Sequence, residues 1–320
     1  MYTLDDYLWM LTDDARVAAY SAAIRAAVKP GDRVIEIGAG IGFFSVLAAR
    51  AGAAHVDALD TNPVVHLGPR IAEANGCGDR IAFHAIDAEQ FDVDTPADVI
   101  VADLRGPTPM AGTALRVMSG ARRRLLRPGG AILPARDTLF CAPVSRPAVF
   151  RREVEAALAR PEVSLGPAGR IAYDTPMRCP VEREDLLAPG GAWAEIDYAT
   201  LEGTDSSGGA SWAFERPVSV GGLAIWFDCD LGNAIGFSTI PGGKVRAYSQ
   251  MFVPFREAVE VESGDSLRTA IDVRLVRNEY VWSWRAWVKP AGTLVERLLV
   301  SQNSLAEHVI DPAALRHTAL

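Results

Sequence analysis

Three alternating glycines, Gly38, Gly40 and Gly42, mark a place where the backbone could come close to a ligand. They follow a short apolar run at 33–37 and precede a stretch at 42–51 whose apolar residues recur at helical spacing. A strand, a glycine turn and a helix form the opening of an α/β nucleotide-binding unit, because glycine bends sharply and places no Cβ in the way of a ligand. We therefore expect a nucleotide or nucleoside to bind at this turn.

The spacing of the glycines and two acids narrows the choice of ligand. A dinucleotide fingerprint needs its third glycine at a position that is Phe43 in this chain. Glu36 precedes the glycines, and Asp60 ends the next apolar run, where an acid can accept both hydroxyls of a ribose. Together these residues resemble the S-adenosylmethionine (SAM) site of class I methyltransferases, whose cationic ligand needs no phosphate-binding Lys or Arg. A dinucleotide-dependent dehydrogenase and a purely structural glycine turn are the alternatives.

Strands and helices alternate through the first part of the chain. Helices are expected at 1–29, 42–51, 63–75 and 110–126, and strands at 33–37, 55–59, 81–86, 97–102 and 131–133. This alternation predicts a parallel sheet, and ligands of such sheets lie beyond the carboxyl ends of the strands. Four successive strand ends carry acids, namely Glu36, Asp60, Asp87 and Asp103. Their shared position predicts a binding site at that edge of the sheet.

The composition changes after Pro134. Short runs rich in Val, Ile, Phe, Trp and Tyr follow, separated by Gly, Pro and Asp turns. These runs predict an antiparallel, barrel-like β domain. A helical pattern and a loop with Pro and Arg interrupt it at about 146–188. The predicted fold is a Rossmann-like α/β domain at 1–134 followed by an antiparallel β-barrel domain at 135–320.

Composition and charge exclude several classes of protein. The 320 residues are 49% apolar and 22% charged, and the net charge of -8 argues against broad nucleic-acid binding. No apolar run approaches the ~20 residues of a membrane span. The four cysteines lie far apart without a C-x-x-C, and His55, His66 and His84 have no partner at metal-ligand spacing, so we expect neither a disulfide framework nor a metal site. Without a secretion signal, the cytoplasm is the expected compartment.

The order of the parts, an N-terminal helix, a SAM-binding domain and a β-barrel with a helical insertion, resembles the protein arginine methyltransferases over nearly the whole chain. Met10-Leu-Thr-Asp-Asp-Ala-Arg16-Val-Ala-Ala-Tyr20 is similar to the family's helix that folds over the cofactor. The resemblance implies that Arg16 pairs with the methionine carboxylate of SAM and that Met10 packs on its adenosyl part. The insertion at 146–188 resembles the family's dimerisation arm, which implies a homodimer.

The segment Asp87-Ala-Glu89-Gln-Phe91 is similar to the family segment that holds adenine. The resemblance implies that an acid takes the adenine amino group and that a main-chain amide, at Ala88, meets the ring. Glu89 stands at the family position of that acid, and Asp87 is a near competitor.

The substrate residues depart from the family pattern. The family holds its substrate guanidinium between two glutamates of one hairpin. Asp103 stands at the first position and Gly112 at the second, and no acidic residue occurs in 104–136. Burying a guanidinium against one carboxylate, with Arg105 nearby, would leave charge and donors unpaired at a cost of several kcal/mol.

A second departure lies in the β domain, where Ala247 replaces the histidine of the family's Thr-His-Trp loop and Tyr248 keeps an aromatic ring. Cofactor residues are thus kept while substrate residues are changed. The sequence therefore predicts a SAM-dependent methyltransferase acting on an O or N nucleophile of a small molecule or modified peptide. Asp103 is the expected base or hydrogen-bond acceptor, and Tyr7, Arg105 and Tyr248 are candidates for the substrate wall.

Two alternatives are open at this point. One is a true arginine or peptide N-methyltransferase whose second carboxylate comes from Glu153 or Glu155 of the insertion, or from a partner subunit. The other is a SAM-binding scaffold without turnover, because the family's catalytic residues are depleted. Intact Glu36, Arg16 and Asp60 disfavour the scaffold, since an inactive protein has little need of a complete cofactor site.

Overall fold

Two helices, rather than the single helix expected at 1–29, begin the chain in this computed structural model, which describes residues 2–305. They are α1 (Leu4–Leu11) and α2 (Asp14–Ala27). Asp13 separates them because its carboxylate accepts the backbone N–H of Arg16 at 3.3 Å and so starts a new helix.

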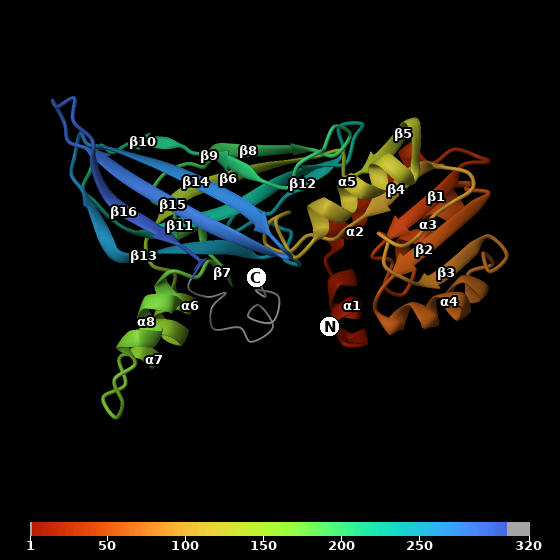
Figure 1. Cartoon of the computed structure of the whole chain (residues 1–320), viewed down its shortest axis with the longest axis horizontal. Helices are drawn as coiled ribbons and strands as arrows, with labels where there is room; N and C mark the ends of the chain where they lie inside the picture. Colours follow the sequence, from red (N-terminus) through yellow and green to blue (C-terminus); the bar gives the residue numbers. More distant parts are fainter. Residues whose placement is uncertain (1, 306–320) are drawn as a thin grey trace.

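The first domain is a five-stranded parallel sheet in the order β3-β2-β1-β4-β5 (Figure 1). Its strands are β1 (Arg33–Ile37), β2 (His55–Asp60), β3 (Ile81–Ala85), β4 (Ala97–Ala102) and β5 (Leu126–Leu133). The connecting helices are α3 (Phe43–Ala51), the 3-10 helix η1 (Pro63–Leu67), α4 (Gly68–Ala74) and α5 (Ala114–Arg124). The strand order reverses between β1 and β4, and ligands of open parallel sheets bind at such a point. The Rossmann-like α/β domain is confirmed.

The second domain consists of two antiparallel sheets, one in the order β10-β14-β15-β16 with β9 beside β14, the other in the order β7-β13-β11-β6-β8 with β12 beside β11. The strands are β6 (Arg136–Val144), β7 (Met177–Cys179), β8 (Gly191–Asp197), β9 (Ser206–Gly208), β10 (Ser211–Ala213), β11 (Val218–Asp230), β12 (Gly236–Ser238), β13 (Gln250–Val261), β14 (Ser266–Val276), β15 (Glu279–Lys289) and β16 (Arg297–Asn303). The antiparallel β domain is likewise confirmed.

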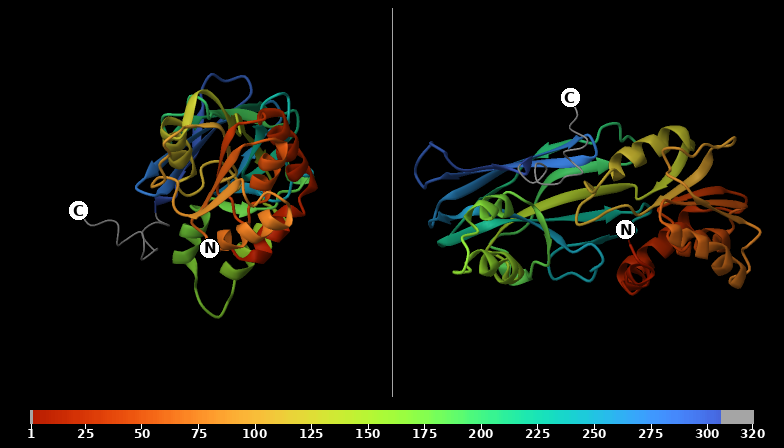
Figure 2. Two further views of the ribbon diagram at one scale, coloured as in Figure 1. Left: turned by 90° about the vertical axis from the view of Figure 1, so that its right-hand side faces the viewer. Right: turned by 60° about the horizontal axis from the view of Figure 1, so that its bottom comes forward.

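A helical arm interrupts this β domain after β6. It consists of α6 (Ala148–Phe150), a π-helical turn η2 (Arg151–Glu155), α7 (Ala156–Leu158) and α8 (Gly166–Tyr173), together with the 3-10 turn η3 (Arg183–Asp185) after β7. The arm projects from the β domain on the same side of the molecule as α1 (Figure 2). Phe150 anchors it, because this fully buried ring packs edge-on against Phe252 with centroids 5.1 Å apart.

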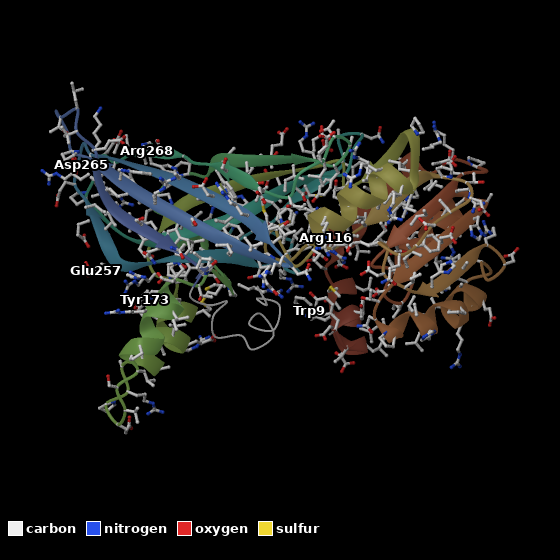
Figure 3. The ribbon with its side chains drawn as sticks, in the orientation of Figure 1. Trp9, Arg116, Tyr173, Glu257, Asp265 and Arg268 are labelled. Carbon is white, nitrogen blue, oxygen red and sulfur yellow. The ribbon has the colours of Figure 1, made fainter. Side chains whose placement is uncertain are left out.

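The two domains are joined by buried aromatic residues and a surface bridge. Tyr20 of α2 stacks on Phe44 with centroids 4.8 Å apart and lies 6.3 Å from Phe237 of β12. Arg116 of α5 lies at the junction (Figure 3), where it pairs with Glu89 at 2.9 Å and donates to the Asn278 side chain at 2.7 Å. These contacts fix the β domain against the carboxyl edge of the parallel sheet. Among residues 2–305, no helix has the length and apolar character to cross a membrane.

Candidate functional site

A cavity with two lobes lies beyond the carboxyl ends of β1, β2 and β4. The larger lobe has about 340 Å³ and reaches the β domain, while the smaller lobe has about 280 Å³ and lies beside β3 and α5. The two lobes share the lining residues Gly38, Asp60, Thr61 and Leu104. The predicted position of the site at the strand ends therefore agrees with the cavity.

The glycine turn adopts backbone conformations that only glycine tolerates well. Gly38, Gly40 and Gly42 have φ of 76°, 55° and 83°. A Cβ on Gly40 would lie 2.4 Å from Tyr7 Cε1, and one on Gly38 would lie 2.6 Å from Leu104 Cδ2. Thus Tyr7 of α1 packs directly on Gly40, which does not line either lobe, whereas Gly38 lines both. The close approach expected for a ligand is made at Gly40 by a protein side chain.

Glu36 and Asp60 differ in their surroundings. Glu36 is 3% exposed and accepts a hydrogen bond from the Ser45 hydroxyl, and burial raises its pKa to about 8. Asp60 accepts the backbone N–H of Gly40 at 2.6 Å and that of Asn62 at 2.7 Å. These bonds fix the Asp60 carboxylate where the two lobes meet, a suitable position for an acceptor of ribose hydroxyls.

The adenine-binding candidates do not lie together. Asp87 and Ala88 line the smaller lobe. Glu89 lies outside the lining of both lobes, and its carboxylate forms an ion pair with Arg116 of the same domain. The geometry therefore favours Asp87 over Glu89 as the acid that faces a ligand.

Met10 and Arg16, both predicted to be cofactor residues, line the larger lobe. The Arg16 guanidinium, however, is already engaged. Its Nε and Nη2 approach Asp103 Oδ2 at 2.7 and 2.6 Å, and its Nη1 donates to the Met10 carbonyl at 3.3 Å. Arg16 thus connects the α1 backbone to the end of β4.

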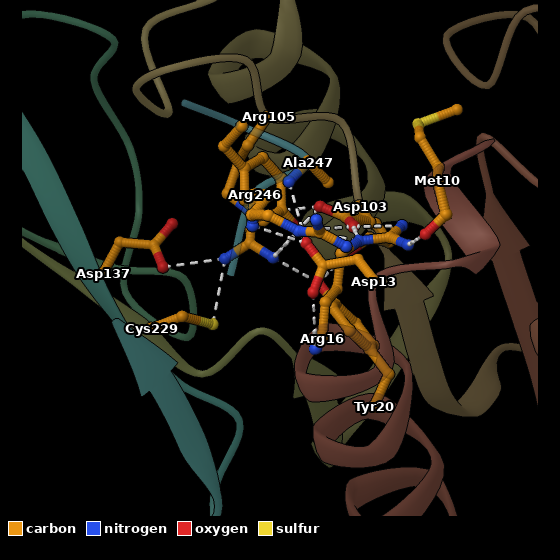
Figure 4. Close-up of polar contacts among 12 residues, drawn as sticks. Met10, Asp13, Arg16, Tyr20, Asp103, Arg105, Asp137, Cys229, Arg246 and Ala247 are labelled. Atoms are coloured by element: carbon orange, nitrogen blue, oxygen red, sulfur yellow. Dashed lines mark hydrogen bonds and ion pairs between the residues drawn. The ribbon is translucent and has the colours of Figure 1, made fainter. Parts of the chain in front are cut away.

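Asp103 lies at the centre of a buried network (Figure 4). Arg105 Nε and Nη2 donate to its Oδ1 at 3.2 and 3.1 Å, while Arg16 Nη2 at 2.6 Å and the Tyr248 hydroxyl at 2.6 Å approach its Oδ2. Burial alone would raise the pKa of Asp103, but the two guanidinium groups hold it below its ordinary value. Asp103, which the sequence predicts to be a base or hydrogen-bond acceptor for the substrate, thus has both carboxylate oxygens engaged by side chains of the chain itself.

Arg105 is also turned inward. Nη1 donates to Asp137 Oδ1 and to Cys229 Sγ, each at 2.9 Å, and Nη2 donates to the Tyr20 hydroxyl. The side chain is 2% exposed. Every N–H group of this guanidinium has a partner in the protein, so Arg105 lines the larger lobe without a donor to offer a substrate.

The other candidates for the substrate wall, Tyr7 and Tyr248, both line the larger lobe. The Tyr248 ring is 4% exposed, and its hydroxyl is bound to Asp103. Tyr7 lies nearer the glycine turn, where burial, and then the charge of Asp60, raise the pKa of its hydroxyl to about 12. Tyr7 is therefore a neutral wall residue near physiological pH.

The carboxylates of the arm are not near the site. Glu155 pairs with Arg146 and accepts the Tyr173 hydroxyl at 2.8 Å, and Glu153 pairs with Arg152 at 2.9 Å. Neither glutamate lines either lobe. Across residues 2–305, no three His, Cys, Asp or Glu side chains are grouped so that they could hold a metal ion.

Two site residues were missed by sequence reasoning. Asp137, fully buried on β6, pairs with Arg105 and accepts the Tyr198 hydroxyl at 2.7 Å. The available signal was an acidic residue two positions before Leu139, which places both side chains on the same buried face of β6. Asp13 accepts the N–H groups of residues 246 and 247 at 2.7 and 2.8 Å and ties the loop before Tyr248 to the α1–α2 junction. No local pattern reveals that long-range contact.

Sequence comparisons find methyltransferases. A family model described as ribosomal protein L11 methyltransferase (PrmA) matches residues 20–130. A probable protein arginine N-methyltransferase 6 of Arabidopsis thaliana is 27% identical over 233 residues, or 70% of this chain and 54% of that protein. An arginine N(omega)-methyltransferase of Streptomyces achromogenes subsp. streptozoticus is 28% identical over 272 residues, or 81% of this chain and 73% of that protein. The chain thus spans about half the length of the plant relative.

Solved structures share the whole fold. The Arabidopsis thaliana protein arginine methyltransferase 10 superposes with a TM-score of 0.81 at 18% identity, covering 94% of this chain and 98% of that one. A chain of the Trypanosoma brucei PRMT1 enzyme-prozyme heterotetrameric complex gives a TM-score of 0.80 at 18% identity, covering 93% of this chain and 96% of that one. The chain therefore shares its fold with these two structures over 93% and 94% of its length.

Proposed function

We propose that this chain, which is similar to arginine methyltransferases, is a class I SAM-dependent methyltransferase that methylates an O or N nucleophile other than a guanidinium. One observation carries the proposal. Asp103, the carboxylate that faces the acceptor end of the larger lobe, is bound on both oxygens by Arg16 and Arg105 of the chain itself. A substrate guanidinium entering there would meet guanidinium groups and no free carboxylate, at a cost of several kcal/mol.

The cavity fits the cofactor that the fold family implies. SAM joins an adenosine to a methionine, and the two lobes meet at Gly38 and Asp60. Asp87 would face the adenine in the smaller lobe, Asp60 the ribose, and Arg16 the methionine end in the larger lobe. At Gly38, which lines both lobes, a φ of 76° favours glycine, and a Cβ would lie 2.6 Å from Leu104 Cδ2. When bound, SAM supplies an electrophilic methyl group on a sulfonium.

The protein's contribution to methyl transfer is alignment and exclusion of water. Tyr7, Met10 and Leu11 of α1 form one wall of the larger lobe, and Phe43 and Phe44 contribute apolar surface. An in-line displacement gains most from holding the nucleophile in register with the methyl group. Because Asp103 is saturated, we propose an acceptor whose lone pair is available near neutral pH, such as an amine that releases its proton to solvent or a carboxylate oxygen.

The mouth of the larger lobe supports an acceptor with an anionic group. Arg178 of β7 lines this lobe, is exposed, and donates to the Ala247 carbonyl at 2.8 Å. Three arginines line the lobe among the described residues. Arg16 and Arg105 pair with Asp103, whereas Arg178 has no carboxylate of residues 2–305 within ion-pair distance. A carboxylate on the acceptor could therefore pair with it without displacing an internal contact.

Arginine itself is the second candidate acceptor. The Streptomyces relative, matched over 81% of this chain, is named as an arginine N(omega)-methyltransferase. In this chain, such a reaction would require the guanidinium of Arg105 to leave its position between Asp103 and Asp137.

An acceptor screen separates these possibilities. The purified protein is incubated with radiolabelled SAM and amino acids, small amines, small carboxylic acids, free arginine or an arginine-containing peptide, and S-adenosylhomocysteine and labelled product are measured. We expect turnover with an acceptor that lacks a guanidinium. Turnover restricted to arginine or the peptide would overturn the proposal, and SAM binding without transfer to any acceptor would favour a scaffold.

We also propose that the arm mediates a homodimer. It projects away from the β domain (Figure 2). Val163, in the loop between α7 and α8, is 63% exposed. The α1 helix on the same side exposes Leu8 and Trp9 by 48% and 50%. Light scattering of the full chain should give twice the monomer mass, and Val163→Glu should lower it. A monomer at high micromolar concentration would contradict this proposal.

A further inference from the structure

We infer that the Arg105 side chain fills a complete guanidinium-binding site in the wall of the larger lobe. It thereby excludes guanidinium ligands from that site. Its link to acceptor choice rests on the proposed function, whereas the site itself rests on geometry. The side chain lies in the wall of the larger lobe, beside Leu104 and Gly106. Its guanidinium is buried among groups from both domains, including Tyr20, Asp137 and Cys229.

The polar partners form a fork-like arrangement suited to a guanidinium. Asp103 Oδ1 accepts from Nε and Nη2 along one edge, at 3.2 and 3.1 Å. Asp137 Oδ1 accepts from Nη1 on the other side at 2.9 Å. The Tyr20 hydroxyl, the Tyr248 hydroxyl at 3.4 Å and Cys229 Sγ at 2.9 Å complete the ring. A planar group with a fixed set of donors matches this ring, and a lysine ammonium would not.

Aromatic rings enclose the same guanidinium. Its Cζ lies within cation–π distance of four rings, at 5.2 Å from the Phe227 centroid, 5.4 Å from Tyr248, 5.5 Å from Phe237 and 5.8 Å from Tyr20. An ion pair that served only to join two domains would need a carboxylate and one arginine. Two carboxylates, hydroxyl groups and an aromatic enclosure instead describe a binding site for one planar cation.

This geometry predicts that removing the side chain leaves a usable site. In Arg105→Ala, Asp103 and Asp137 would face each other across a cavity of guanidinium shape. Methylguanidine should then bind to the variant and not to the wild type. At about ten times its dissociation constant it should raise the melting temperature of the variant by roughly 3 °C. Methylammonium, which has the charge without the fork, and urea, which has the shape without the charge, should not.

Calorimetric titration and thermal unfolding, both without SAM, test the inference independently of any methyl transfer. Arg127→Ala is the matched control, because Arg127 pairs with Asp98 at the surface and is 50% exposed. Adding Asp137→Asn to Arg105→Ala should weaken methylguanidine binding at least about tenfold. Equal responses to methylguanidine and methylammonium, or binding by the wild type, would overturn the inference.

A variant that fails to fold gives the same test in another form. Arg105→Ala is then refolded from urea with and without methylguanidine, and recovery of folded protein is followed by circular dichroism. Recovery that depends on methylguanidine supports the inference. No recovery with methylguanidine, or equal recovery with methylammonium, would contradict it.

Discussion

The two ends of the cavity use their polar groups in opposite ways. At the cofactor end, Asp60 and Asp87 line the cavity, and their carboxylates accept the backbone N–H groups of Gly40, Asn62 and Glu89. At the acceptor end, Asp103, Arg105 and Tyr248 are bound to one another. The cofactor end therefore holds its carboxylates with neutral backbone groups, whereas the acceptor end holds Asp103 with two guanidinium groups and a tyrosine hydroxyl.

The largest effect should come from Asp103→Asn. This change leaves two buried guanidinium groups without their shared carboxylate, and removing one partner of a buried ion pair costs about 3–5 kcal/mol. Urea unfolding measures the loss of free energy of unfolding. The control is Asp92→Asn, since Asp92 is 87% exposed and should change stability by less than about 1 kcal/mol. Loss of turnover at unchanged stability would instead return Asp103 to the role of a base.

Glu36→Gln should change the pH dependence of stability. The pKa of Glu36 is about 8 in the folded protein against an ordinary 4.5. The folded state holds the proton more tightly, so the stabilising contribution is complete below the unfolded pKa and is lost as pH rises toward 8. Without SAM, the wild type should lose on the order of 3 kcal/mol from Glu36 between pH 5 and 8. The glutamine variant should lack this slope, and parallel urea midpoints for both proteins would contradict the account.

Asp60→Asn tests the cofactor end. A charge-assisted bond to a ribose hydroxyl is worth about 1.5–3 kcal/mol, so SAM affinity should fall by roughly tenfold or more. Asparagine keeps one oxygen acceptor, which limits damage to the glycine turn. Isothermal titration with SAM measures the change, again with Asp92→Asn as control. An unchanged dissociation constant would mean that another group holds the ribose.

The smallest effect distinguishes Glu89 from Asp87. Glu89→Gln breaks an exposed ion pair with Arg116 and should alter stability and SAM affinity by less than about 1 kcal/mol. Asp87→Asn should weaken SAM binding more, because Asp87 lines the smaller lobe. Titrations of the two variants side by side decide the matter. A larger loss for Glu89→Gln would restore the adenine contact implied by the family resemblance.

Much of the cofactor end could be predicted from the sequence because its signals are local. A strand, three glycines and a helix occupy 33–51, and the acids at the strand ends follow from the alternation of strands and helices. The acceptor end could not be predicted in this way. Arg16 and Tyr248 reach Asp103 from 87 and 145 residues away, and no local pattern encodes such pairs. The break between α1 and α2 was missed for a local reason, because apolar spacing continues across Asp13 while its side chain starts a new helix.

The most direct test of the central claim is mass spectrometric detection of methylarginine. The wild-type protein, shown by titration to bind SAM, is incubated with SAM and either free arginine or an arginine-containing peptide. We expect no methylarginine above the enzyme-free control, because the guanidinium site is filled by Arg105. Repeated turnover to methylarginine by the wild-type chain would contradict it.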